Sequence, residues 1–222
     1  MGFIKDIQES FQMHANRTFS VQMSAYMLNQ FKFYGIKAPF RRELTKPLFD
    51  KYNLEIRDTF RSLVFDLYDL PYRELHMVAI EIFEKQFKKS YEKKDIHLIE
   101  NLITINSWWD SVDFIAKNIL GKYLQIYLEE IPEIISRFSE AENLWLNRST
   151  IIFQLGYKEK TDEQLLFKQC LIHKNSKEFF IQKAIGWALR EYGKTNPDAV
   201  LNFVETNTLK PLSKREAIRN LI

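Results

Sequence analysis

Apolar residues recur along this chain at the spacing of an amphipathic helix. The segments "PYRELHMVAIEIFEKQFKK", "DEQLLFKQCLIH" and "FFIQKAIGWALREYG" each place apolar side chains three or four residues apart, which makes one face of a helix apolar. No segment shows the sustained alternation of a half-buried strand. The pattern therefore predicts an all-α protein. In the first segment the apolar face consists of Leu75, Val78, Ala79, Ile82, Phe83 and Phe87.

Short breaks separate the predicted helices, among them "DLPY", "EIPEI" and "LKPLSK". Comparable helices recur at spacings of about 35 to 45 residues, which is typical of HEAT-like helical pairs stacked in a solenoid. Because the repeats share little sequence identity, a compact helical bundle is an alternative that the spacing leaves open. No linker and no low-complexity segment interrupts the chain, so we interpret residues 1–222 as one domain.

The segment "ITINSWWDSVDFIAKNIL" contains two adjacent tryptophans within one predicted helix. Neighbouring residues of a helix point about 100° apart, so the two indoles cannot face the same core. Ser107 is a suitable N-cap for this helix. Trp108 belongs to an apolar row with Val112, Ile115 and Ile119, and we expect this row to face the core.

Trp109 and Asp113 share a different face of the same predicted helix, and Asp110 lies close to it. A large exposed aromatic beside a carboxylate often marks a binding surface. The alternative is structural: Trp109 packs against a neighbouring repeat, and Asp113 pairs with a lysine or an arginine. Spacing alone slightly favours the structural interpretation.

A second predicted helix, residues 177–192, carries a row of basic residues around one tryptophan. The row consists of Lys183, Trp187, Arg190 and Lys194. Basic and aromatic side chains together suit a phosphate backbone with an exposed sugar or base. A solvated basic face, with Trp187 at a contact between repeats, is at least as consistent with the pattern.

Arg148 lies in a third predicted helix, within "NLWLNRSTIIFQL", among apolar residues. A partly buried arginine needs an anionic partner. That partner is either a carboxylate of the same chain or an external phosphate, and the sequence leaves both open.

The composition narrows the class of protein without identifying it. Of the 222 residues, 45% are apolar and 27% are charged, and the formal net charge is +3, which permits nucleic-acid binding but does not demand it. The single cysteine, Cys170, excludes an intrachain disulfide and suits a reducing cytoplasm. We expect Cys170 to be a small buried hydrophobe. The four histidines show no ligand spacing, so we expect neither a metal nor another cofactor, and we expect no transmembrane helix or secretory signal.

Four stretches together resemble a known family: "SWWDSVD", "FQLGYKEKTDEQLL", "SKEFFIQKAIGWALREYGKTNPD" and "PLSKREAI". They are similar to the bacterial alkylpurine DNA glycosylases with HEAT-like repeats, the AlkD family, and the resemblance extends from about Phe11 to Ile218. It implies a right-handed α-α superhelix, or solenoid, whose basic concave face grips duplex DNA. It also implies excision of alkylated purines, 3-methyladenine and 7-methylguanine, without a base-flipping pocket. The implied setting is base excision repair by a cytoplasmic monomer, associated with the nucleoid when bound to DNA.

The resemblance also implies roles for individual residues. Trp109 and Trp187 match the two tryptophans that line the cleft and contact the deoxyribose at the lesion, and Asp113 matches the catalytic carboxylate. Arg148 matches a cleft arginine near the DNA backbone. With these matches the functional interpretation of the tryptophan–aspartate face becomes the favoured one. The basic residues of the second helix are then candidate DNA contacts: Lys183, Arg190 and Lys194.

The implied chemistry needs few groups. Ordinary glycoside hydrolysis uses one carboxyl group to protonate the leaving group and another to stabilise the sugar. A purine alkylated at N3 or N7 is already cationic and leaves as a neutral base, so no general acid is required. One carboxylate near C1′ then stabilises the oxocarbenium-like sugar and orients water, and tryptophan faces assist by cation–π attraction.

The N-terminal part of the chain departs from the family pattern. The stretch "TFSVQMSAYMLNQF" predicts a helix with Met23, Tyr26, Met27 and Gln30 along one side, which would supply the family's N-terminal DNA contacts. "GIKAP" stands where an active member is expected to have "GIQTP", so Lys37 and Ala38 are departures. Lys37 is a candidate phosphate contact, whereas the lost glutamine would remove a hydrogen bond to DNA, and the sequence leaves the net effect open. The alternative to an active glycosylase is therefore a catalytically weak or inactive paralogue that binds damaged or branched DNA. A HEAT-like protein scaffold is a third interpretation.

Overall fold

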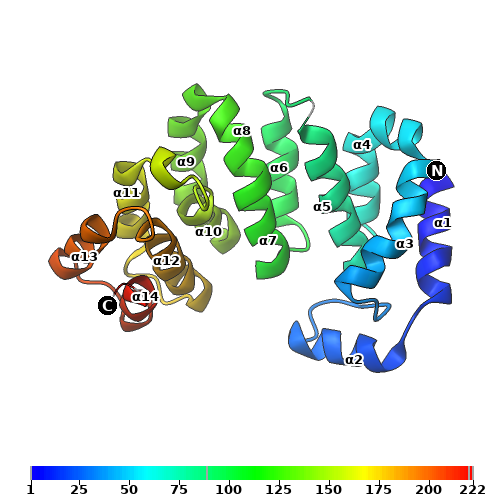
Figure 1. Ribbon diagram of the computed structural model, residues 1–222, viewed down its shortest axis with the longest axis horizontal. Coiled ribbons are helices and arrows are strands. Elements are labelled where there is room, and N and C mark those ends of the chain that lie inside the picture. The colour runs from blue at the N-terminus through cyan, green and yellow to red at the C-terminus, as the bar shows by residue number, and fades with distance from the viewer. Residues whose placement is uncertain (1, 89, 220, 222) are drawn as a thin grey trace. The chain divides into compact units, whose positions relative to one another are not determined.

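Helices make up the regular structure of this protein. The computed structural model describes residues 2–88, 90–219 and 221, and within them the strand-like pairing is limited to an isolated bridge between Lys32 and Tyr72. The prediction of an all-α protein is confirmed. The chain folds into two compact units, residues 1–91 and residues 92–222, whose helices are labelled in Figure 1. A single domain over residues 1–222 stays a prediction.

Unit 1 is built from the first five helices of the chain. In Figure 1, α4 and α5 lie side by side, and they share the most extensive helix–helix contact among the described residues of this unit. All six side chains predicted to form the apolar face of α5 are buried, so the helical period found in the sequence is confirmed there. The five helices are α1 (Gly2–Met13), α2 (Arg17–Tyr26), α3 (Ala38–Lys51), α4 (Asn53–Tyr68) and α5 (Arg73–Phe87).

The helix α2 buries none of its own side chains. Three polar groups spaced four residues apart attach it instead to the extended segment that comes after it. The backbone N–H of Asn16 and the hydroxyls of Ser20 and Ser24 donate to the carbonyl oxygens of residues 34, 33 and 31, at 2.8, 2.7 and 3.0 Å. These hydrogen bonds therefore help to hold α2 in place, together with half-buried side chains such as Phe19 and Met23.

The predicted helix "TFSVQMSAYMLNQF" is too long at its C-terminal end. The structure ends α2 at Tyr26, and the left-handed backbone of Leu28 and Asn29, with φ of 54° and 59°, turns the chain back. Asparagine tolerates this conformation better than most residues. Gln30 consequently does not continue the helical row of Met23 and Tyr26, so that part of the prediction is wrong.

A buried carboxylate holds the segment between α2 and α3. Glu74, in the first turn of α5, is 1% exposed and accepts hydrogen bonds from the backbone N–H groups of Tyr34, Gly35 and Ile36 at 3.1, 2.9 and 3.0 Å. Gly35 has φ 88°, and a Cβ there would lie 2.1 Å from the carbonyl oxygen of Asn16, so only glycine fits this turn. The carboxylate thereby satisfies three donors of a segment that has no helical partners.

Unit 2 continues the pattern of packed neighbouring helices. In Figure 1, α9 lies beside α10, α10 beside α12, and α12 beside α14, as expected for stacked helical pairs. None of the described helices is long and apolar enough to cross a bilayer. The elements are α6 (Asp95–Thr104), α7 (Trp109–Ile115), a π-helical turn (Ala116–Leu120), α8 (Gly121–Ile126), a 3-10 turn (Leu128–Glu130), α9 (Ile131–Glu140), α10 (Leu144–Ile152), a second 3-10 turn (Lys158–Lys160), α11 (Glu163–His173), α12 (Phe179–Tyr192), α13 (Pro197–Thr206) and α14 (Pro211–Ile218).

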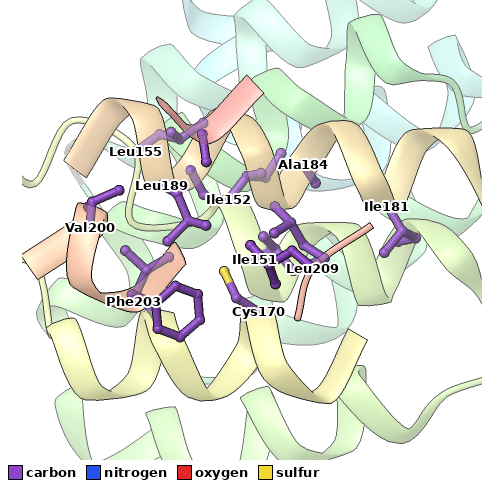
Figure 2. Close-up of a cluster of buried hydrophobic side chains, with 14 of the residues drawn as sticks. Ile151, Ile152, Leu155, Cys170, Ile181, Ala184, Leu189, Val200, Phe203 and Leu209 are labelled. Carbon is purple, nitrogen blue, oxygen red and sulfur yellow. The ribbon is translucent and has the colours of Figure 1, made fainter. Parts of the chain in front are cut away.

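A shared apolar core joins α10, α11, α12 and α13 in unit 2 (Figure 2). Ile152 of α10, Cys170 of α11, Leu189 of α12 and Val200 of α13 meet there with no exposed surface. Burial raises the pKa of the Cys170 thiol well above its ordinary value, which leaves the thiol protonated and unreactive. The prediction that Cys170 is a small buried hydrophobe is confirmed.

Candidate functional site

The helix that carries the paired tryptophans begins one residue later than the sequence predicts. Trp108 has an extended backbone, with φ −155° and ψ 164°, and α7 starts at Trp109. The hydroxyl of Ser107 donates to the carbonyl oxygen of Ile103 at 2.6 Å and does not cap α7. The prediction of Ser107 as the N-cap is wrong because the last carbonyls of α6 lack helical partners and take the hydroxyl instead.

A π-helical turn interrupts the helix after α7. It begins at Ala116, and such a turn accommodates one extra residue and changes the angular register of the next helical residues. At its end, Gly121 approaches the neighbouring backbone so closely that a Cβ would lie 2.5 Å from the carbonyl oxygen of Phe153. The Tyr157 hydroxyl donates a hydrogen bond to the Gly121 carbonyl. The apolar spacing predicts one uniform helix over residues 107–120 and gives no sign of this turn.

The predicted core row is confirmed except at its first member. Val112, Ile115 and Ile119 have no exposed surface. Trp108 is only half-buried; its ring packs against the rings of Trp145 and Phe180, with centroid separations of 5.8 and 5.4 Å. Its indole N–H is buried and has no hydrogen-bond partner among the described residues. Trp108 therefore lies at the edge of the core, within an aromatic cluster, so the prediction that it faces the core is only partly confirmed.

Trp109 and Asp113 stand one turn apart on α7, and both are half-buried. Burial alone therefore does not separate the two adjacent tryptophans. What separates them is their surroundings: Trp108 packs in an aromatic cluster outside the helix, whereas Trp109 shares a helix face with a carboxylate.

Arg148 is the partner of Asp113. The Nε and Nη2 atoms of Arg148 donate to the two carboxylate oxygens at 2.7 and 2.8 Å, a bidentate pair. The remaining terminal nitrogen, Nη1, donates to the carbonyl oxygen of Phe180, in the first turn of α12. The side chains of Arg148 and Asp113 are 5% and 16% exposed. Of the two partners that the sequence left open, the structure selects the internal carboxylate, while a DNA contact by Arg148 stays a prediction.

Two opposing effects act on the Asp113 carboxyl. Burial, the larger effect, raises its pKa above the ordinary value, and the negative charge of Asp110 adds to the rise. The hydrogen bonds and the positive charge of Arg148 lower the pKa and oppose burial. Arg148 therefore stabilises the ionised carboxylate in a place that would otherwise disfavour it.

The basic row on α12 is paired with a carboxylate rather than open. Lys183 Nζ donates to Glu216 Oε1 at 2.9 Å, and Arg190 Nη1 donates to Glu216 Oε2 at 2.7 Å and to the Glu216 backbone carbonyl at 3.0 Å. The two cations, first Lys183 and then Arg190, lower the pKa of Glu216 to about 2. Lys194 is exposed and pairs with Glu191 at 2.5 Å. The row predicted to be a basic stripe is thus largely neutralised within the protein.

Gly186 explains how Glu216 comes so close to α12. A Cβ at this position would lie 2.4 Å from the Glu216 Cβ and 3.0 Å from the Ser213 carbonyl oxygen. The helices α12 and α14 share the most extensive helix–helix contact among the described residues of unit 2. A glycine inside a helix often marks a close approach of this kind, and it is the one signal in the sequence that could have pointed to Glu216.

Trp187 comes directly after Gly186 and is half-buried. Part of its surface packs against the apolar core of unit 2, which is drawn in Figure 2. The helix that carries it begins at Phe179 rather than Lys177 and ends at Tyr192, as predicted, with Gly193 as its C-cap. Through the Phe180 carbonyl, the same helix accepts a hydrogen bond from Arg148. The Asp113–Arg148 pair is therefore tied to the helix of Trp187, and the convergence of Trp109, Asp113 and Trp187 on one cleft stays a prediction.

Tyr26 and Lys37 belong to unit 1. Tyr26, the last residue of α2, is 70% exposed. Lys37 directly precedes α3 and is exposed, with its ammonium 4.1 Å from the ring centroid of Phe19. Both side chains are accessible to a ligand, and their contact with DNA stays a prediction.

A pocket of about 350 Å³ in unit 2 is lined by residues other than the predicted cleft residues Trp109, Asp113, Arg148 and Trp187. Its lining comes from the end of α10, the loop after it, the start of α11 and the last turns of α12, and includes Gly156, Lys158 and Tyr192. Among the described residues, no three histidine, cysteine or acidic side chains gather as metal ligands would.

Comparisons with known proteins agree on one family. The family model described as DNA alkylation repair enzyme matches residues 7–221. The chain is also similar to a solved structure described as a predicted DNA alkylation repair enzyme from Enterococcus faecalis, at 35% sequence identity and a TM-score of 0.85. That match covers 92% of this chain and 95% of the other. A search of curated proteins found no match.

Proposed function

Because the chain belongs to the DNA alkylation repair enzyme family, we propose that it is a monofunctional DNA glycosylase. Its substrates are N3- and N7-alkylated purines in duplex DNA, such as 3-methyladenine and 7-methylguanine, and it acts without a pocket for a flipped base. The observation that carries the proposal is the Asp113 carboxylate, one turn from Trp109 and held at both oxygens by one edge of the Arg148 guanidinium, through Nε and Nη2.

The reaction breaks the bond between C1′ and the purine nitrogen. The bonding electrons pass to the cationic ring, which leaves as a neutral base, and positive charge develops on the sugar. Water then adds to C1′ and releases a proton, which leaves an abasic site. Because the leaving group needs no protonation, one fixed carboxylate is enough to stabilise the sugar cation and orient the water.

The ion pair with Arg148 suits Asp113 to this role. A buried carboxylate tends to take up a proton, and a protonated Asp113 would lose its attraction for the sugar cation. Arg148 keeps the charge and also fixes the orientation of the carboxylate, which a catalytic group needs. Each oxygen still has a second lone pair after accepting one bond from Arg148.

The decisive experiment is a single-turnover assay on a duplex oligonucleotide that contains one 7-methylguanine, with release of the free base quantified. We expect the wild type to release the base above the spontaneous rate. Asp113→Asn should reduce the rate constant by a factor of about 100 or more, as is typical when one stabilising group is removed, with duplex affinity changed by less than about threefold. Unchanged excision by Asp113→Asn would refute the catalytic assignment.

A second candidate function is DNA binding without excision. The departures at Lys37 and Ala38 from the pattern of active members favour it. The same assay separates the two functions, because this candidate predicts salt-dependent duplex binding by the wild type with no base release.

A further inference from the structure

Glu216 bridges two cations of α12, Lys183 and Arg190. Lys183 and Arg190 are seven residues apart, about 10 Å along the helix axis, and Trp187 lies between them on the same face. One carboxylate oxygen of Glu216 accepts from each cation, at 2.9 and 2.7 Å. The Glu216 Cβ lies against Gly186, the neighbour of Trp187.

The bridge is built into the packing of α12 against α14. Arg190 also donates to the backbone carbonyl of Glu216 at 3.0 Å, and Ser213 Oγ donates to the Gln182 carbonyl at 3.0 Å. The Glu216 side chain is only 11% exposed, compared with 38% for Lys183 and 22% for Arg190. Because the Glu216 carboxylate is fixed by this packing, it pairs with Lys183 and Arg190 in the absence of any ligand.

We propose that Glu216 is an internal counter-anion that withholds Lys183 and Arg190 from the phosphates of bound DNA. The two cations instead position the face of α12 that presents Trp187. The inference rests on the proposed function, since it assumes that this face meets DNA. It differs from the prediction that Lys183 and Arg190 are themselves phosphate contacts.

The benefit of such masking is selectivity. Each free cation that neutralises a phosphate strengthens binding to any duplex, damaged or not, because this attraction is independent of sequence. Withholding two cations beside Trp187 removes affinity that does not depend on the lesion. The DNA contacts left at this face are then made by groups that interact with the reacting sugar, such as Trp187.

The test is the salt dependence of binding to an undamaged duplex. In a plot of log affinity against log NaCl concentration, each neutralised phosphate contributes a slope of about −0.9. We expect Glu216→Gln to bind more tightly than the wild type at low salt, with a slope steeper by about 0.9 to 1.8. Glu205→Gln removes an exposed glutamate of α13 and controls for the change in net charge; it should leave the slope nearly unchanged. An unchanged slope in Glu216→Gln overturns the inference.

The cations give the reciprocal test. In the wild-type background, the double variant Lys183→Gln/Arg190→Gln should have a slope within about 0.3 of the wild-type slope, because neither cation is neutralising a phosphate. In the Glu216→Gln background the same pair should abolish the added steepness. A slope shallower by about 1.8 in the first background would show that both cations already bind phosphate. If Glu216→Gln does not fold, Lys183→Gln alone decides the matter: no change supports the inference, and a slope shallower by about 0.9 overturns it.

Failure of the proposed function is distinguishable from failure of this inference. Wild-type protein that binds duplex DNA without releasing 7-methylguanine refutes the glycosylase, and the slopes still test the masking. If the wild type has no measurable duplex affinity, salt-dependent binding gained by Glu216→Gln supports the masking. If neither the wild type nor Glu216→Gln shows salt-dependent duplex binding, both the glycosylase proposal and the masking proposal are overturned.

Discussion

Arg148 donates hydrogen bonds from Nε and Nη2 to the two carboxylate oxygens of Asp113, at 2.7 and 2.8 Å, although the two residues are 35 positions apart in the sequence. The third side-chain nitrogen of Arg148 binds the backbone of α12. One side chain on α10 therefore orients a carboxylate on α7 and attaches the helix that carries Trp187. Because both partners are mostly buried, removing either one leaves an uncompensated charge.

Arg148→Met should lower the free energy of unfolding by about 3–5 kcal/mol, because it leaves the buried Asp113 carboxylate without a partner. Urea unfolding at pH 7 measures the change. The double variant Asp113→Asn/Arg148→Met should cost less than the sum of the two single variants. Arg137→Met breaks a more exposed pair with Glu100, at 2.6 Å, and should cost about 1 kcal/mol or less. Equal costs at the two sites would contradict the buried-pair interpretation.

Excision should fall at low pH. Only the ionised Asp113 stabilises the sugar cation, and burial places its pKa above the ordinary aspartate value. Activity is therefore present above that pKa and is lost as the pH falls through it. In Arg148→Gln the group that lowers the pKa is gone, so the midpoint of the loss should move to higher pH. Single-turnover rates across the pH range, corrected for spontaneous depurination, test this; coincident midpoints would count against the role given to Arg148.

Gly186→Ala should destabilise the protein by about 1–3 kcal/mol through overpacking, although alanine favours helix by about 1 kcal/mol. The new Cβ would lie 2.4 Å from the Glu216 Cβ, so α14 must shift. Gly193→Ala is the matched control: its Cβ would meet carbons of the Leu221 side chain at 2.6 and 3.0 Å, which can move aside at lower cost. Thermal unfolding compares the two, and a stabilised Gly186→Ala would disprove the close packing.

The contribution of Glu216 to stability should depend on acid pH. The folded state holds its pKa at about 2, below the ordinary glutamate value of 4.5. The stabilisation is therefore complete above pH 4.5 and is lost as the pH falls from 4.5 towards 2. The difference in unfolding free energy between the wild type and Glu216→Gln should be larger at about pH 6 than at about pH 3. Urea titrations at the two pH values measure it, and a constant difference would argue against the ion pairs with Lys183 and Arg190.

The helical class and the buried helix faces could be predicted from sequence because both depend on local periodicity. The apolar face of α5 and the row Val112, Ile115 and Ile119 are buried as the spacing indicated. The family resemblance was also sound, since the family model covers residues 7–221. Arg148 was recognised as a side chain that needs an anion, since a buried guanidinium in an apolar neighbourhood has few alternatives.

The features that the sequence did not predict depend on contacts between distant segments. Ser107 resembled an N-cap, but its hydroxyl serves the preceding helix. The π-helical turn is followed directly by Gly121, which meets the backbone of Phe153, and neither feature has a signature in the local spacing. Glu216 is 26 positions from Arg190 and 33 from Lys183, so the spacing that revealed the basic row gave no indication of its counter-anion.

The attachment of α2 has a thermodynamic consequence. Three hydrogen bonds to the carbonyls of residues 31, 33 and 34 hold this helix, and none of its side chains is buried. The apolar surface of its own that a release would expose is limited to the covered parts of half-buried side chains such as Phe19 and Met23. An opening that exposes little surface carries a small m-value, so its free energy should vary little with denaturant concentration while the core of unit 1 stays closed.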